Sequence, residues 1–176
     1  FGNLTKLLGY GFHAVLPNKR YSLPALDSSL ESKNNSSLIP KKIWQTNFSE
    51  KCTLPMYMNY KFNRSLSRDF EYHYVSTEDR DEYMKNHASG RVYAAFKRLT
   101  DGAAQADLWR LVVLYNEGGI YMDIDATLVQ PLSQTIEGNQ HIFIKNYGEF
   151  TNFFLATAPK SELFAEFIEK VVTNIE

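Results

Sequence analysis

The chain has 176 residues, enough for one domain with a hydrophobic core, and its 44% hydrophobic and 22% charged residues are ordinary globular values. A formal net charge of −1 excludes the strongly basic surface of nucleic-acid-binding proteins, so no nucleic-acid partner is expected. The single cysteine, Cys52, excludes an internal disulfide and a cysteine metal cluster, and no apolar run in the sequence reaches the roughly 18 residues of a membrane span.

The N-terminal part differs in composition from the rest of the chain. Residues 1–26 contain three lysine or arginine residues and no acidic one, which indicates either a basic amphipathic arm with peripheral membrane contact or a poorly ordered terminus. Residues 27–37 are polar and are interpreted as a linker. We therefore expect an arm and linker over residues 1–37 and one folded domain over residues 38–176.

From residue 38 onward, the hydrophobic pattern predicts strands that alternate with helices. Such alternation predicts an α/β fold with a mixed, mainly parallel sheet flanked by helices. The chain ends inside a helical pattern, so the domain is interpreted as C-terminally incomplete. The predicted elements are, in chain order, strands over 39–45 and 70–75, helices over 78–87, 91–99 and 103–116, strands over 120–124, 142–144 and 153–157, and a helix that begins near 159–161.

The predicted helix over 103–116 is apolar on nearly every face, which is typical of a buried helix. It nevertheless carries Asp107 and Arg110, which lie three residues apart and therefore share a face. One interpretation is an ion pair within the helix. The other is that both side chains point into a polar pocket at the sheet edge, where Arg110 would bind a phosphate or carboxylate and Asp107 would accept hydrogen bonds from sugar hydroxyls.

Two carboxylates, Asp123 and Asp125, end the apolar run that follows Gly118-Gly119. On a strand, residues two apart lie on one face, so Tyr121 would lie beside them. Oxygen ligands suit hard divalent cations, and ligands of open α/β sheets bind at the carboxyl ends of strands. The pair therefore predicts a site for Mn²⁺ or Mg²⁺.

Trp44, at the end of the first predicted strand, either stacks on a base or sugar ring or belongs to the core. His73, His87 and His141 show no metal-ligand spacing and are interpreted as structural or surface residues.

These patterns resemble a known family. The segments Ile39-Pro40-Lys41-Lys42-Ile43-Trp44-Gln45-Thr46 and, from Ala106 to Asp125, the helix, Gly-Gly turn and Asp-x-Asp are similar to sugar transferases with a DXD motif, as in glycosyltransferase family 32. That family includes initiating α-1,6-mannosyltransferases and bacterial capsule and lipopolysaccharide enzymes, and the glucosylating domain of clostridial toxins is more distantly similar. The resemblance implies a Rossmann-type GT-A fold, a nucleotide-sugar donor, a Mn²⁺ or Mg²⁺ requirement and retention of the anomeric configuration.

The resemblance also implies roles for individual residues. Asp123 and Asp125 would bind the metal ion and, through it, the donor diphosphate. Asp107 and Arg110 would hold the donor sugar, and these two residues together with Asp125 are the expected catalytic groups. The remaining expected donor contacts are Tyr121, Trp44 against the nucleotide base, and Asn152 beside the sugar.

The expected function is therefore transfer of a sugar from a UDP- or GDP-sugar to a glycan or lipid-linked glycan acceptor, in surface polysaccharide synthesis. The expected location is the cytoplasm, with peripheral contact at the inner face of a membrane, because the chain has one cysteine and no anchor. The Golgi lumen is the alternative if the protein is eukaryotic.

Two other functions compete with this one. The run from Asp123 to Val129 also matches the motif of haloacid-dehalogenase-like phosphohydrolases, in which the first Asp is the nucleophile. Those enzymes need further acidic residues downstream, and no Asp follows Asp125. The second alternative is a non-catalytic domain that binds nucleotide sugar or glycan.

Overall fold

The computed structural model describes residues 2–31 and 37–176, and the side chains of residues 2–6 and 8 lie outside the description. Residues 32–36 of the predicted linker lie outside the described residues. The described helices are α1 (Gly2–Val15), α2 (Leu54–Ser65), α3 (Thr77–His87), α4 (Gly90–Arg98), α5 (Gly102–Glu117), α6 (Leu132–Ile136) and α7 (Glu162–Ile175). The strands are β1 (Tyr21–Ser22), β2 (Leu26–Asp27), β3 (Lys42–Thr46), β4 (Lys51–Cys52), β5 (Glu71–Val75), β6 (Gly119–Met122), β7 (His141–Asn146) and β8 (Glu149–Thr157).

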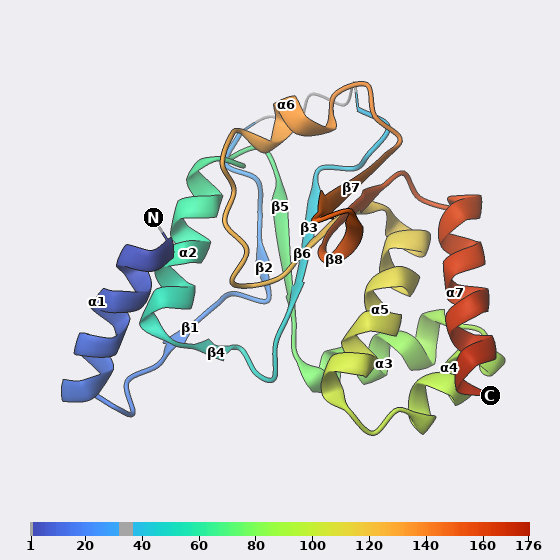
Figure 1. The fold of residues 1–176 in the computed structure, drawn as a ribbon, viewed down its shortest axis with the longest axis horizontal. Helices are drawn as coiled ribbons and strands as arrows, with labels where there is room; N and C mark the ends of the chain where they lie inside the picture. The colour runs from blue at the N-terminus through green and yellow to red at the C-terminus, as the bar shows by residue number, and fades with distance from the viewer. Residues whose placement is uncertain (1, 32–36) are drawn as a thin grey trace.

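One mixed sheet of six strands forms the centre of the molecule, with the order β2-β5-β3-β6-β8-β7 (Figure 1). The central strands β5, β3 and β6 are parallel, whereas β2, β8 and β7 pair antiparallel. The prediction of a mainly parallel sheet therefore holds only for the centre, because the chain adds a hairpin at one edge and a short returning strand at the other.

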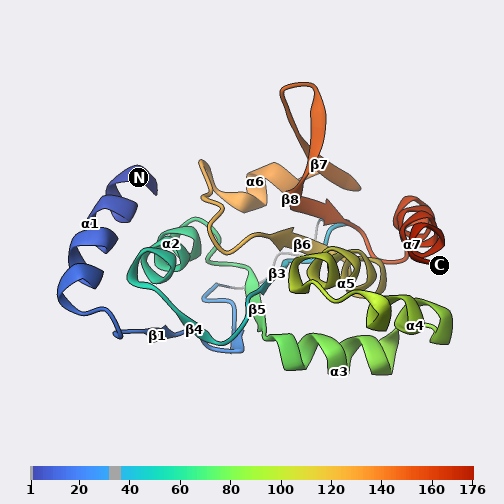
Figure 2. The same cartoon turned by 60° about the horizontal axis from the view of Figure 1, so that its bottom comes forward.

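Helices cover both faces of this sheet. The helices α3, α4, α5 and α7 gather on one side and α2 lies on the other (Figure 2). Each side has its own hydrophobic core: Ile43, Ile120 and Met122 face α2, while Trp44 and Tyr121 face α5. The alternation of side chains along β3 and β6 thus separates the two cores.

A double glycine sets the close approach of α5, β6 and β3. Gly118 has φ 65° and Gly119 has φ 97°, which L side chains rarely adopt. A Cβ atom on Gly119 would lie 2.7 Å from the carbonyl oxygen of Lys42 in β3. The glycines therefore allow the chain to leave a buried helix and enter a buried strand directly.

The N-terminal segment belongs to the fold earlier than the sequence predicts. β2 pairs with β5 in the main sheet, β1 pairs with β4, and Leu23 is buried in the core. Residues before position 38 therefore contribute strands and a core side chain to the fold, while the domain boundary between residues 37 and 38 stays a prediction.

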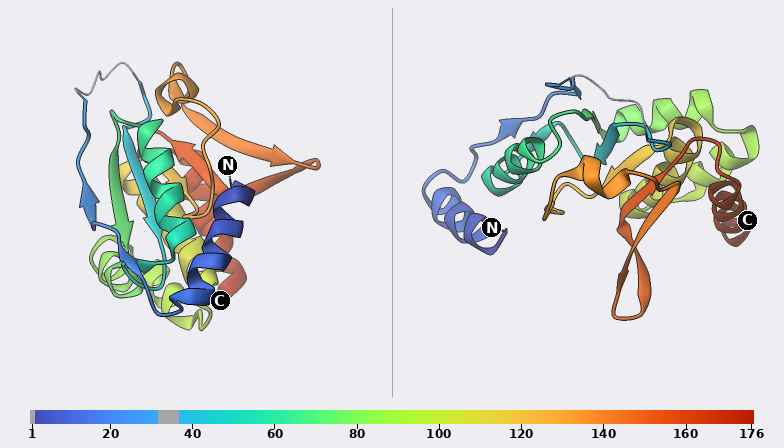
Figure 3. Two further views of the ribbon diagram at one scale, coloured as in Figure 1. Left: turned by 90° about the vertical axis from the view of Figure 1, so that its left-hand side faces the viewer. Right: turned by 90° about the horizontal axis from the view of Figure 1, so that it is seen from above.

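The predicted arm forms helix α1, which lies against the outer side of α2 (Figure 3). The hairpin of β7 and β8 projects away from the layers (Figure 3). Among the described residues, no helix has the length and apolar character needed to cross a membrane.

Candidate functional site

The two carboxylates of the Asp-x-Asp motif lie in a turn at the carboxyl end of β6. The strand ends at Met122, and the backbone N–H of Ala126 donates to the carbonyl oxygen of Asp123 over 3.0 Å. The predicted strand over 120–124 is thus shorter in the structure. Asp123 is partly exposed and Asp125 is exposed, so both carboxylates can meet a ligand from solvent.

Asp123 is tied to Tyr121 and Arg110. The Tyr121 hydroxyl donates to Asp123 Oδ1 over 2.6 Å, and Arg110 Nη1 lies 3.9 Å from the same oxygen. The Arg110 guanidinium also lies over the Tyr121 ring, 4.2 Å from its centroid. Burial is the largest cause that raises the pKa of Tyr121, so this hydroxyl stays protonated and keeps donating to Asp123.

The same arginine connects α5 with β8. Arg110 Nη2 pairs with Asp107 Oδ1 over 2.6 Å, and its Nη1 donates to the carbonyl oxygen of Asn152 over 2.6 Å. Asn152 Nδ2 in turn donates to Asp107 Oδ1 over 3.2 Å. The structure thus shows the ion pair within the helix, and Asn152 joins it from β8.

Partial burial raises the pKa of the Asp107 carboxyl, Arg110 opposes that rise, and Asp123 adds to it. The two carboxylates thus lie close enough to influence each other. A cation or a sugar hydroxyl at this site would relieve the repulsion.

Buried amide side chains of α2 hold the turn in place. Asn59 Nδ2 donates to the carbonyl oxygens of Ile124 and Ala126 over 3.0 and 2.8 Å. Asn63 Nδ2 donates to Ala126 over 2.8 Å, and its Oδ1 accepts from the backbone N–H of Leu128 over 2.9 Å. The motif is therefore a rigid turn rather than a loose loop.

Trp44 does not join this site. It is 7% exposed, its Nε1 donates to the carbonyl oxygen of Gly118 over 3.0 Å, and its ring stacks on His73 with centroids 4.2 Å apart. Gly118 precedes β6, so the indole points away from the carboxyl end of the sheet. The structure thus favours the core interpretation of Trp44 over the predicted contact with a nucleotide base.

The turn presents two carboxylates, Asp123 and Asp125, as ligands for a metal ion. Among the described residues, no group of three or more His, Cys, Asp or Glu side chains converges on one point. One oxygen of Asp123 accepts a hydrogen bond from Tyr121. Within the described residues, neither oxygen of Asp125 accepts a hydrogen bond, so its carboxylate can bind a cation. That set fits Mg²⁺ or Mn²⁺, which keep several water ligands and bind through one or two carboxylates together with substrate phosphates.

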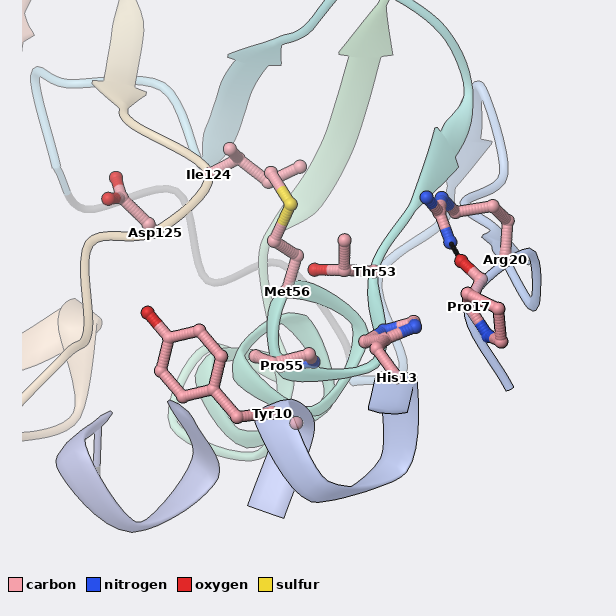
Figure 4. A pocket seen from close by; sticks show the side chains of 10 residues that line it. Tyr10, His13, Pro17, Arg20, Thr53, Pro55, Met56, Ile124 and Asp125 are labelled. Atoms are coloured by element: carbon pink, nitrogen blue, oxygen red, sulfur yellow. Dashed lines mark hydrogen bonds between the residues drawn. The ribbon is translucent and has the colours of Figure 1, made fainter. Parts of the chain in front are cut away.

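A cavity of about 860 Å³ opens on the other side of Asp125 (Figure 4). The side chains of Ile124 and Asp125 form one wall, and α1 and the beginning of α2 form the others. The Tyr10 ring points from α1 toward the turn (Figure 4). The lining residues are Gly9, Tyr10, His13, Pro17, Arg20, Thr53, Pro55, Met56, Ile124 and Asp125.

Some side chains near the turn were not singled out from the sequence. Asn59 and Asn63 lie on a helix that was not predicted, and Arg80 and Thr46 bond to each other near the same sheet edge over 3.0 Å. The sequence contains a pattern that could have indicated Asn59 and Asn63, because their i, i+4 spacing places two amides on one face of a helix. It contains no such pattern for Arg80 and Thr46.

A family model and two curated proteins that match this chain all belong to glycosyltransferases. The model of the "glycosyltransferase sugar-binding region containing DXD motif" family matches residues 55–142. The initiation-specific alpha-1,6-mannosyltransferase of Candida albicans is 28% identical over 153 residues, which are 80% of this chain and 39% of that protein. The protein of the same description from Saccharomyces cerevisiae is 29% identical over 101 residues, or 53% of this chain and 21% of that one.

A solved structure agrees at the level of the fold. The PaToxG glycosyltransferase superposes with a TM-score of 0.53 at 15% identity, covering 98% of this chain and 69% of that chain. This likeness confirms the predicted GT-A-like α/β fold.

The family match also sets the phosphohydrolase alternative aside, because it covers the Asp-x-Asp turn together with α5 and β6.

The chain spans less than half of each curated relative. The matched segment is half of the chain and contains Asp107, Arg110, Asp123 and Asp125. The chain therefore belongs to the family of glycosyltransferases whose sugar-binding region contains a DXD motif.

Proposed function

We propose that this protein transfers a sugar from a nucleotide-sugar donor to a glycan acceptor with the help of a divalent cation. The observation that carries the proposal is the cluster at the carboxyl end of β6, where Asp107, Arg110, Tyr121, Asp123 and Asn152 interact directly. These residues come from α5, β6 and β8, and a core alone would not need two aspartates there.

The chemistry of glycosyl transfer suits this cluster. When bound by Asp123 and Asp125, a divalent cation would neutralise charge on the departing diphosphate. The reacting sugar carbon becomes cation-like, and the Asp107 carboxylate would stabilise that charge electrostatically. Tyr121 orients Asp123, and Arg110 and Asn152 both hold Oδ1 of Asp107 in place.

The names of the curated relatives favour mannose as the sugar and a mannose-containing glycan as the acceptor. UDP- and GDP-sugars are both candidate donors, and retention of configuration follows from the family resemblance. The relatives are fungal proteins, so a eukaryotic secretory compartment such as the Golgi lumen is favoured over the cytoplasm that the sequence first suggested. A role in surface polysaccharide synthesis stays a prediction.

The cavity beside Asp125 is our candidate for the acceptor. Asp107, Arg110 and Asn152 lie on the α5 side of the turn, whereas the cavity lies on the α1 and α2 side. An exposed aromatic ring, as Tyr10 provides, suits the apolar face of a sugar. Tyr10→Ala should raise the KM for a mannose oligosaccharide and leave the KM for the donor unchanged; an unchanged acceptor KM would refute this location.

Peripheral membrane contact through residues 1–26 is also a proposal. Leu7 and Val15 of α1 are 69% and 78% exposed, which supports it. In sedimentation with anionic vesicles, the double variant Leu7→Glu and Val15→Glu should remain in solution if the proposal is correct. Equal sedimentation of the variant and the wild type would contradict it.

A thermal-shift screen of nucleotide sugars with Mn²⁺ tests the proposed function. A specific donor binds the folded state and raises the melting temperature by mass action. The shift should need Mn²⁺ and should be followed by sugar transfer or slow donor hydrolysis. Metal-dependent binding with neither reaction would favour the non-catalytic alternative, and no shift with any nucleotide sugar would contradict the proposal.

A further inference from the structure

Three arginine side chains are buried in the described part of the chain, and they differ in their partners. Arg64 is 5% exposed and its Nε lies 3.2 Å from Asp27 Oδ2. Arg110 is 6% exposed and pairs with Asp107. Arg80 is 4% exposed, yet it forms no ion pair with any described carboxylate. Buried charged groups in proteins are usually paired with a counter-charge, whereas the carboxylate that acts on Arg80, that of Glu78, forms no ion pair with it.

Arg80 has neutral contacts only. Its Nη1 donates to Thr46 Oγ1 over 3.0 Å and its Nη2 donates to Thr77 Oγ1 over 3.3 Å. Its Nε has no hydrogen-bond partner. A guanidinium has five N–H groups, so most of its donors remain free for a further acceptor.

The position of Arg80 connects it with the Asp-x-Asp turn. Thr46 is the last residue of β3, and Trp44 is opposite Tyr121 in the parallel pairing of β3 with β6. The side chain of Gln45, which precedes Thr46, donates to the carbonyl oxygens of Met122 and Asp123 over 3.4 and 3.5 Å, so the end of β3 lies beside the beginning of the turn. Burial is the largest cause that lowers the pKa of Arg80; Tyr121 and Glu78 oppose that effect and Arg110 adds to it.

Arg110 is a weaker candidate for a phosphate. Its Nε donates to the carbonyl oxygen of Ala106, its Nη1 donates to Asn152, and its Nη2 pairs with Asp107. Its charge and donors are thus largely used by the protein. Among the described residues at this edge, Arg80 is the arginine whose guanidinium keeps N–H groups without a hydrogen-bond partner.

We propose that Arg80 binds the diphosphate of the nucleotide sugar on the α3 side of Asp123, with Thr46 and Thr77 holding the guanidinium in position. This inference rests on the proposed function and adds a diphosphate ligand that neither the sequence motifs nor the resemblance assigned. A guanidinium matches phosphate oxygens by paired N–H···O bonds, which an ammonium group cannot reproduce.

Isothermal titration measures the affinity for UDP and GDP and for the matching nucleosides, uridine and guanosine. A separate thermal-shift assay in EDTA measures whether pyrophosphate alone raises the melting temperature. The variant Arg80→Met should weaken UDP or GDP binding by about 10- to 100-fold, as expected for the loss of charged hydrogen bonds. It should leave binding of uridine or guanosine unchanged and abolish the pyrophosphate shift. Arg80→Lys should restore only part of the diphosphate affinity, and exposed Arg68→Met is the control that should change nothing.

The stability of the unliganded protein gives an independent readout. Arg80→Met removes an uncompensated charge and should not lower the melting temperature, whereas Arg64→Met leaves Asp27 unpaired and should lower it. Undiminished diphosphate binding by both Arg80→Met and Arg80→Lys would overturn the inference. If Arg80→Met does not fold, Arg80→Lys is the deciding variant: a pyrophosphate-induced rise in its melting temperature equal to that of the wild type would overturn the inference.

The outcomes also separate this inference from the proposed function. Pyrophosphate binding that depends on Arg80 supports the inference even if Mn²⁺ has no effect, a result that would count against the proposed function. Conversely, Mn²⁺-dependent donor binding that is equal in wild type and Arg80→Met overturns the inference alone.

Discussion

Single side chains far apart in the sequence position the two carboxylates of the motif. Asn63 is fully buried, and both polar atoms of its amide bond the backbone after Asp125. Because this turn presents Asp123 and Asp125 to solvent, the amide contributes to the site without facing a ligand.

We expect Asn63→Ala to destabilise the fold by about 1–3 kcal/mol per buried backbone group that loses its partner. Urea unfolding at constant pH measures this change. Asn174→Ala, at an exposed position near the end of α7, is the matched control and should lie within about 0.5 kcal/mol of wild type. An equal effect of both variants would show that the amide does not hold the turn.

His73 should make stability depend on pH. Burial lowers its pKa below the ordinary 6.5, and the hydrogen bond that His73 Nε2 forms with the Glu71 carboxylate only partly opposes this. The folded state therefore prefers the neutral ring: stability is full above about pH 6.5 and falls as the pH drops toward the folded-state pKa.

The measurement is the free energy of unfolding at about pH 8 and about pH 5, in wild type and His73→Phe. Phenylalanine keeps an aromatic ring against Trp44 but cannot titrate. The decrease in stability toward acid should be smaller in the variant. A variant with the same pH profile would show that His73 contributes nothing to it.

The sequence predicted those site residues that are close together in the chain. Asp107 and Arg110 share a helix face, and Tyr121 and Asp123 share a strand face, so spacing alone indicated their contacts. Asn152 was assigned through the resemblance, because its contact with Asp107 spans 45 residues. No local pattern could place Arg80 beside this edge.

Among the elements, α2 shows why hydrophobic periodicity can fail. Its buried residues are Asn59, Tyr60, Asn63 and Arg64, so the inward face is largely polar and carries no apolar stripe. That polarity has a structural reason, because the face bonds the Asp-x-Asp turn and the Asp27 carboxylate. Helix α5, in contrast, was predicted nearly to its ends by its apolar surface.

The contact between α1 and α2 depends on one glycine. A Cβ atom on Gly9 would lie 2.1 Å from Pro55 Cγ, whereas one on Gly11 would meet nothing within 4 Å. We expect Gly9→Ala to displace α1 and open the cavity beside Asp125, and Gly11→Ala to leave it in place with slightly higher helix stability.

Hydrogen exchange of the α1 amides distinguishes the two variants. Exchange should become faster in Gly9→Ala and should not in Gly11→Ala. Equal exchange in both would mean that α1 does not pack on α2 at this position.

At the scale of the whole molecule, the sheet separates two functions that the proposal needs. The polar cluster and Arg80 lie on the side of α3 and α5, while the cavity lies on the side of α1 and α2. The Asp-x-Asp turn lies at the edge between them. A donor and an acceptor could therefore approach the same carboxylates from opposite sides.

The central claim is that Asp123 and Asp125 hold a cation that binds the donor diphosphate. Its most direct test is isothermal titration of UDP and GDP, with and without Mn²⁺, into wild type, Asp125→Ala and the control Glu166→Ala. Both substituted side chains are exposed, so the fold should be kept. We predict Mn²⁺-dependent binding in wild type and the control that is lost in Asp125→Ala; equal binding by Asp125→Ala would contradict the account.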